Sequence, residues 1–116
     1  MEFNQITSKI LAFRDARDWR QFHKANHLAA AIAIESAELQ EHFLWQTPAE
    51  VKAKISNPIR RLAVGEELAD VLIYALLLAH EMRLDPAEII TSKLVQNEKK
   101  YPVVKARGRS TKYTEL

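Results

Sequence analysis

Two stretches of the sequence are apolar on every side of a helix, and they constrain the fold more than any other feature. Residues 28–34 contain only leucine, alanine and isoleucine, and residues 71–79 contain only aliphatic residues and one tyrosine. Helices that are apolar all round lie in protein interiors rather than at surfaces. With two glycines and four prolines in 116 residues, turn signals are few. We therefore expect an all-α fold, a helical bundle of four to five helices.

Capping residues and prolines predict where these helices begin and end. Thr47 and Asp85 each precede a proline at the first helical position, with glutamate two residues after that proline, a pattern typical of helix N-termini. The proline at position 58 disfavours the helical conformation at Asn57. The expected helices cover residues 5–16 (capped by Asn4), 26–45, a short segment from 47 to before Pro58, 59–83 and 86–100. Pro102 ends the last helix, so we divide the chain into a helical domain (residues 1–102) and a basic C-terminal tail (residues 103–116).

The composition excludes several classes of protein. The absence of cysteine excludes disulfides, thiolate zinc sites and cysteine nucleophiles, and two glycines leave no phosphate-binding glycine loop. No apolar run approaches the roughly 20 residues that a bilayer requires. The first residues lack the basic and apolar regions of a signal peptide. We expect a cytoplasmic protein with no membrane partner.

The apolar surface of the two stretches exceeds what one bundle of this length can bury. Association of identical copies would bury the excess, and closed symmetric homo-oligomers are the usual solution. We therefore expect a homo-oligomer, a dimer or a tetramer.

The net charge of +2 is divided unevenly along the chain. Residues 1–92 carry ten Lys/Arg and thirteen Asp/Glu, whereas residues 93–116 carry seven and two. An acidic body can hold a cation and a basic C-terminal segment can hold an anion.

Two pairs of carboxylates adjoin the apolar stretches. Glu35 and Glu38 follow the first stretch, and Glu67 and Asp70 precede the second. Side chains three residues apart share a helix face, so each pair points two like charges in one direction. Burying such charges without a partner is costly. The alternative is that both pairs lie on solvated faces of amphipathic helices.

The type of ligand indicates the metal. Four carboxylates without Cys or His suit a hard cation, Mg²⁺ with Mn²⁺ as a substitute. A di-iron bundle would need Glu-x-x-His motifs, which neither pair forms. His42 follows Glu38 by one turn and does not complete that motif.

Aromatic residues follow both carboxylate pairs at helical spacing. Trp45 lies seven residues after Glu38, and Tyr74 lies four after Asp70. Such side chains could stack on a base or pack against a sugar, although core packing is the commoner role for them. Trp19, in an irregular segment, is a third candidate with the same alternative.

The basic C-terminal region offers candidates for phosphate binding. Lys93, Asn97 and Lys100 share one helix face, and Arg107, Arg109 and Lys112 follow them. Ammonium and guanidinium groups are the usual partners of phosphoryl oxygens. A solvated tail is the simpler interpretation, and the short basic stretch with few aromatic residues does not favour nucleic-acid binding.

Together these motifs resemble the MazG-like all-α nucleoside triphosphate pyrophosphohydrolases, and they are closest to the dCTP pyrophosphatase branch. The resemblance covers most of the chain from about residue 17. The segments that carry it are residues 17–23, 35–45, 66–74, 92–93, 97, 101–102, 107–108 and 112–116.

The resemblance implies a helical fold whose protomers assemble as a dimer of dimers. It implies Mg²⁺-dependent hydrolysis of a (deoxy)nucleoside triphosphate, dCTP or a modified pyrimidine dNTP, to monophosphate and pyrophosphate. The metal-binding positions it implies are Glu35, Glu38, Glu67 and Asp70. The substrate-binding positions it implies are Trp19 (reaching in from a neighbouring subunit), Trp45, Tyr74, Lys93, Asn97, Arg109, Lys112 and Tyr113.

The chemistry expected from the residues agrees with this activity. Glu35 or Glu38, where not fully used as a metal ligand, can orient a water molecule for in-line attack on the α-phosphorus. Two alternatives stay open at this stage. One is a related pyrophosphohydrolase for another nucleotide, and the other is a non-enzymatic helical interaction module with a basic nucleic-acid-binding tail.

Overall fold

The computed structural model describes all residues from 1 to 116 and contains helices but no strands. The α-helices are α1 (Phe3–Ala16), α2 (Ala25–Glu41), α3 (Pro48–Ser56), α4 (Pro58–Glu81), α5 (Pro86–Lys100) and the four-residue α6 (Val103–Ala106). Two short 3₁₀ helices, η1 (Arg20–Phe22) and η2 (Tyr113–Glu115), complete the secondary structure. The all-α prediction is confirmed, with one more short helix than expected.

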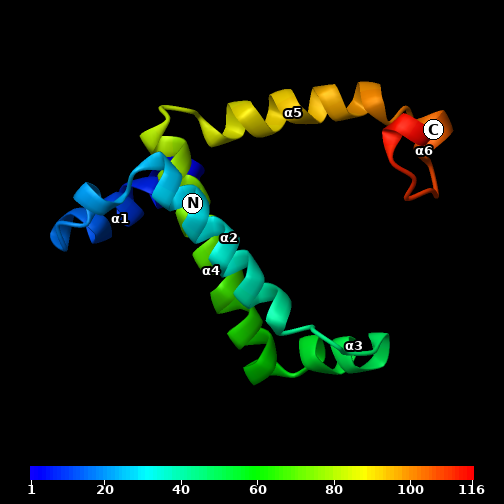
Figure 1. The fold of residues 1–116 in the computed structure, drawn as a ribbon, viewed down its shortest axis with the longest axis horizontal. Helices are drawn as coiled ribbons and strands as arrows, with labels where there is room; N and C mark the ends of the chain where they lie inside the picture. Colours follow the sequence, from blue (N-terminus) through cyan, green and yellow to red (C-terminus); the bar gives the residue numbers. More distant parts are fainter. The chain divides into compact units, whose positions relative to one another are not determined.

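The contacts divide the chain into two compact units, Met1–Arg83 and Leu84–Leu116. In the first unit α4 packs along α2, and both α1 and α3 contact α4. The helix α3 connects the neighbouring ends of α2 and α4, so these two long helices run in opposite directions (Figure 1). The pairing of α2 with α4 is the element of the fold that positions the candidate site.

Capping side chains start two of the helices as the sequence predicts. Thr47 accepts a hydrogen bond from the N–H of Glu50, and Glu50 bonds back to the N–H of Thr47, which completes a capping box. Asp85 accepts from the N–H groups of Ala87 and Glu88. Asn57 has an extended backbone before its proline and also caps α4 with its side chain, a role that we did not predict. The N-termini of these three helices are therefore determined by the capping residue and the first helical turn.

Three helix boundaries were predicted wrongly, among them the end of α4, which lies at Glu81 rather than at residue 83. The first helix begins at Phe3 rather than after Asn4, because Glu2 forms a capping box with Gln5. The second helix ends at Glu41, four residues short of Trp45, because residues 42–45 form turns. The correction at the end of the second helix changes the position of a candidate site residue.

The first unit buries little of its apolar surface. Leu28, Leu77 and Ala79 are its fully buried hydrophobic residues, whereas Ile59 is 82% exposed and Leu72 is more than half exposed. The two apolar stretches are therefore each covered on one side only within a single chain. None of the helices is both long enough and apolar enough to cross a membrane.

The second unit contains α5, α6 and η2. The α5 helix ends at Lys100, as predicted, and the chain turns at Pro102 into α6. The Tyr101 and Tyr113 rings meet edge to face at 5.9 Å, and the Lys100 ammonium lies 4.8 Å from the centre of the Tyr113 ring. The C-terminal residues therefore fold back on the end of α5. The functional division between residues 1–102 and 103–116 stays a prediction.

Candidate metal and substrate site

Three carboxylates from two helices meet where α2 packs against α4. Glu35 and Glu38 on α2 and Glu67 on α4 each offer one oxygen, and these oxygens all lie within 4.8 Å of one another. Asp70 follows Glu67 by one turn of α4. Because α2 and α4 run side by side, Glu67 joins the Glu35–Glu38 pair although the residues are separate in sequence.

Two carboxylates of this cluster, Glu35 and Glu67, have a raised pKa and hold protons more tightly than ordinary glutamates do. Burial, then a hydrogen bond with Glu38 and the charges of Glu38, Asp70 and Glu67, raise the pKa of Glu35 to about 7. Burial and the negative charges of Glu38 and Asp70 also raise the pKa of Glu67, while His42 acts in the opposite direction. The cluster therefore concentrates negative charge that only a proton or a cation relieves.

The donor set fits a hard divalent cation. Oε2 of Glu35 and Oε2 of Glu67 are both buried and have no hydrogen-bond partner. Buried polar atoms are nearly always satisfied in folded proteins, so two carboxylate oxygens without a hydrogen-bond partner fit a site that holds a cation. The ligands are all oxygen atoms, which suits Mg²⁺ or Mn²⁺.

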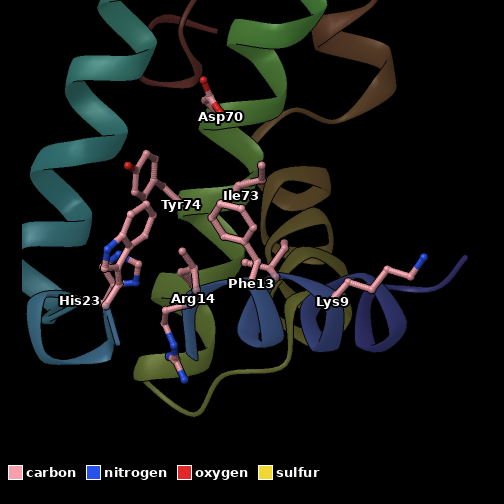
Figure 2. Close-up of a pocket in the computed structure, with 10 residues that line it drawn as sticks. Lys9, Phe13, Arg14, His23, Asp70, Ile73 and Tyr74 are labelled. Carbon is pink, nitrogen blue, oxygen red and sulfur yellow. The ribbon is translucent and has the colours of Figure 1, made fainter. Parts of the chain in front are cut away.

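A cavity of about 460 Å³ opens beside this cluster, and Asp70 is part of its wall. The remaining lining residues come from α1, from the segment that follows it and from α4: Lys9, Ile10, Phe13, Arg14, Trp19, His23, Ile73, Tyr74 and Leu77. Figure 2 shows Asp70 and Arg14 at opposite ends of the lining, with Tyr74, Ile73 and Phe13 between them. Asp70 thus joins the acidic helix face to a largely apolar and aromatic chamber.

The aromatic walls of the cavity are held by contacts with one another. The rings of Phe13 and Trp19 meet edge to face at 5.7 Å, and those of His23 and Tyr74 at 6.5 Å. The guanidinium of Arg17 lies 3.7 Å from the centre of the Phe13 ring. Such contacts fix the orientation of the aromatic rings and leave the cavity between them open. The chamber therefore offers planar surfaces of the kind on which a heterocyclic base stacks.

Three polar residues of the cavity, Lys9, Arg14 and His23, were not identified from the sequence. Arg14 is only 5% exposed and pairs with Asp15 at 2.8 Å. Burial, and then the charge of Arg14, lower the pKa of His23, and Glu81 opposes them. The His23 imidazole is therefore neutral at neutral pH. Arg14 and His23 reach the cavity because α1 and the segment that follows it pack on α4, and no spacing along the chain connects them to Asp70.

A family model described as MazG-like matches residues 30–116. The chain belongs to the MazG-like family. It is 43% identical over 104 residues to dCTP pyrophosphatase 1 of Homo sapiens and 41% identical over 104 residues to that of Rattus norvegicus, which covers 90% of this chain in both cases. The chain spans about three fifths (61%) of the length of these curated relatives.

A solved structure agrees with this assignment. A pyrophosphatase from Archaeoglobus fulgidus superimposes with a TM-score of 0.77 at 37% sequence identity, covering 85% of this chain and 91% of the other. The helical arrangement of this MazG-like chain is therefore that of a known pyrophosphatase structure.

Of the aromatic candidates, two lie in the cavity of this MazG-like chain and one does not. Trp19 and Tyr74 line the same chamber as Asp70, and whether Trp19 also reaches into a neighbouring copy stays a prediction. Trp45 lies beyond the end of α2 and is 92% exposed. Its predicted alignment with Glu35 and Glu38 along one helix is wrong, because the helix stops first.

The backbone at Trp45 is also unusual. Its φ of 61° lies in the left-handed region, which costs a residue with a side chain roughly 1–2 kcal/mol. An indole that is both exposed and held on a strained backbone gains nothing within its own chain. This combination suits a side chain that meets another molecule.

The basic candidates all belong to the second unit. Lys93 and Asn97 lie on α5 beside a shallow apolar hollow formed with Ile89, Ile90 and Leu94. Arg109 and Lys112 are exposed in the C-terminal segment, and Tyr113 packs on Tyr101. Their role in binding phosphate stays a prediction.

Proposed function

We propose that this chain hydrolyses nucleoside triphosphates to the monophosphate and pyrophosphate with the help of a divalent cation. The observation that carries the proposal is the position of Asp70, which lies one helical turn from a cluster of converging carboxylates and also lines an aromatic cavity. A cation site next to a base-sized chamber matches the two ends of a nucleotide. The names of the relatives, dCTP pyrophosphatase and pyrophosphatase, agree with this function.

We further propose that the preferred substrate is a pyrimidine deoxynucleotide, dCTP or a modified form of it. The support comes from the 43% identity to a protein named dCTP pyrophosphatase 1, together with a chamber walled by Trp19, Tyr74 and Phe13. Base stacking on aromatic rings tolerates many bases. The neutral His23 and the buried Arg14 are the polar groups of the chamber that can distinguish base edges.

We assign the cation site to Glu35, Glu38, Glu67 and Asp70, with Mg²⁺ as the physiological ion and Mn²⁺ as its substitute. When bound there, the cation would offset the charge of the phosphate oxygens and lower the pKa of a water molecule. The orphaned Oε2 atoms of Glu35 and Glu67 supply lone pairs for it.

The chain's own groups then have distinct tasks. Glu35 or Glu38 orients a water molecule in line with the α-phosphorus and accepts its proton. Trp19 and Tyr74 hold the base. We retain Lys93, Asn97, Arg109, Lys112 and Tyr113 as the groups that contact phosphate, because their chemistry suits phosphoryl oxygens.

We propose that the working form is a homo-oligomer, a dimer of dimers. The support is the amount of exposed apolar surface on α4, from Ile59 and Leu62 to Leu68 and Leu72. Soluble proteins rarely leave so many large apolar side chains in water. The exposed Trp45 is suited to reach the cavity of a neighbouring copy, as the resemblance suggested for Trp19.

The test is release of pyrophosphate from each of the eight common NTPs and dNTPs, with Mg²⁺, with Mn²⁺ and with EDTA. We expect turnover with a divalent cation only, and fastest with dCTP. Glu38→Gln is the inactive variant, and Glu66→Gln, at an exposed neighbouring position on α4, is its matched control. Absence of turnover for all eight substrates would reject the activity, and preference for another nucleotide would correct the substrate.

A further inference from the structure

Lys54 is a buried cation without an acidic partner. It lies on α3, its exposed fraction is 9%, and no carboxylate forms a salt bridge with it. Its neighbour Lys52 is exposed on the same helix. Burial of an ammonium group is costly unless its hydrogen-bonding capacity is used, so the contacts of Lys54 should explain its position.

The ammonium group of Lys54 binds the end of another helix. Its Nζ donates a hydrogen bond to the carbonyl of His42, the residue that caps α2, and it lies 5.8 Å from the centre of the Phe43 ring. The last carbonyls of a helix lack intrahelical partners and carry the negative end of its dipole. Lys54 supplies the cation and the donor that this helix end needs.

This contact fixes the turn that carries Trp45. The turn is otherwise held by short-range backbone bonds, among them Phe43 N–H to Gln40 and Gln46 N–H to Phe43. Trp45 itself is 92% exposed and has a left-handed backbone, so packing of its own side chain does not determine where the indole points. Its direction depends on the backbone of residues 42–46, and Lys54 ties that backbone to α3.

We propose that Lys54 is a positioning residue for Trp45, and that it sets the direction in which the indole meets the nucleotide base. The part that concerns the nucleotide rests on the proposed function, whereas the part that concerns the indole does not. Lys54 is twelve residues from His42, so the tie is formed only when α3 folds back on the end of α2.

The direction of the indole is tested without any activity measurement. In a Trp19→Phe background, 5-fluorotryptophan labels Trp45 alone, because the chain has two tryptophans, and ¹⁹F NMR reports its surroundings. We expect Lys54→Met to shift and broaden the resonance, Lys54→Arg to restore it and Lys52→Met to leave it unchanged. An unchanged resonance in Lys54→Met would overturn the proposal.

Steady-state kinetics then tests the link to the nucleotide. We expect Lys54→Met to raise KM about threefold to tenfold with little change in kcat, a fraction of the loss expected for a stacked base. In a Trp45→Ala background the same substitution should have no further effect on KM, because the two residues act through one contact. An equal effect of Lys54→Met with and without Trp45 would overturn the proposal.

The two experiments separate the inference from the function on which it rests. A protein with no activity but with the expected ¹⁹F response would reject the function and retain the role of Lys54 in orienting Trp45. If Lys54→Met loses its helical circular dichroism, Lys54→Gln replaces it in both experiments, because its shorter side chain is polar but does not reach the carbonyl of His42.

Discussion

Glu35 on α2 and Glu67 on α4 each have an Oε2 atom that is buried and accepts no hydrogen bond. The two residues are far apart in sequence and meet only because α2 and α4 pack side by side (Figure 1). The unmatched charge therefore lies across the main helix–helix contact of the first unit. A proton or a cation that neutralises this charge also strengthens the contact between α2 and α4. Binding of protons or cations at this site is therefore coupled to folding.

The metal-free protein should lose stability as the pH rises. The pKa of Glu35 is raised from 4.5 to about 7, so the folded state binds the proton more tightly than the unfolded state. Its contribution to stability is fully present below the unfolded pKa and is lost as the pH rises through about 7. Thermal unfolding in EDTA from about pH 5 to about pH 8 checks this.

The variant Glu35→Gln isolates the effect of that one group. His23 has a lowered pKa and therefore contributes in the opposite direction, losing stability as the pH falls. We expect the variant to have a smaller decrease in Tm with pH than the wild type has. Equal pH dependence in the two proteins would contradict the assignment.

Removal of one carboxylate should stabilise the metal-free protein and should weaken its binding of the cation. Glu67→Gln relieves repulsion from Glu38, so we expect a higher Tm than the wild type in EDTA. The same variant loses a ligand, and we expect its Mn²⁺ affinity to fall by at least about tenfold. Isothermal titration with Mn²⁺ and unfolding in EDTA measure the two effects, with Glu66→Gln as the matched control. A variant with unchanged Mn²⁺ affinity would place the cation elsewhere.

Truncation of Trp19 should weaken substrate binding more than it slows the reaction. Stacking on an aromatic ring contributes about 1–3 kcal/mol per base, which corresponds to a KM increase of about 5-fold to 150-fold for Trp19→Ala. Trp19→Phe retains a ring beside Phe13 and should lose much less. Steady-state kinetics of both variants checks this, and a KM equal to that of the wild type in Trp19→Ala would remove Trp19 from the substrate site.

Substitution of Leu77 should be costly for stability. Leu77 is among the few fully buried hydrophobic residues and also lines the cavity. Leu77→Ala should lower the free energy of unfolding by about 2–5 kcal/mol, which denaturant titration measures. Lys52→Ala on exposed α3 serves as the control and should change stability by less than about 0.5 kcal/mol.

Charges on the exposed face of α4 should separate the copies. Leu68 and Leu72 lie one turn apart and are both exposed in the single chain. We expect the double variant Leu68→Glu, Leu72→Glu to have the 13.3 kDa mass of one chain in light scattering, and the wild type to have a multiple of it. Burial of unpaired carboxylates in an interface is the reason. A wild-type protein of 13.3 kDa would reject the oligomer.

What the sequence predicted correctly rests on local chemistry. The beginnings of α3 and α5 followed from Thr47 and Asp85, because a cap needs only its own first turn. The spacing of Glu35 with Glu38 likewise placed both carboxylates on one face. Glu67 joins these two carboxylates because α4 packs on α2. The spacing of residues along one helix cannot predict that packing.

The wrong position of Trp45 and the missed cavity residues share a cause, which is contact between distant segments. The local turn bonds after α2 are joined by a bond from Lys54, twelve residues after His42, to the carbonyl at the helix end. The cavity likewise depends on α1 packing against α4, so His23 and Arg14 had no sequence neighbour that revealed them. The expected position of Trp45 was wrong for the first of these reasons.

The helix α4 carries both Asp70 and Tyr74, so the chain should not tolerate insertions or deletions between these two residues. A helix advances about 1.5 Å per residue, so the Cα atoms of Asp70 and Tyr74 are separated by about 6 Å along one helix axis. Inserting or deleting one residue between them would rotate Tyr74 by about 100° relative to Asp70, out of the chamber seen in Figure 2. Point substitutions can tune this stretch, but its length is fixed.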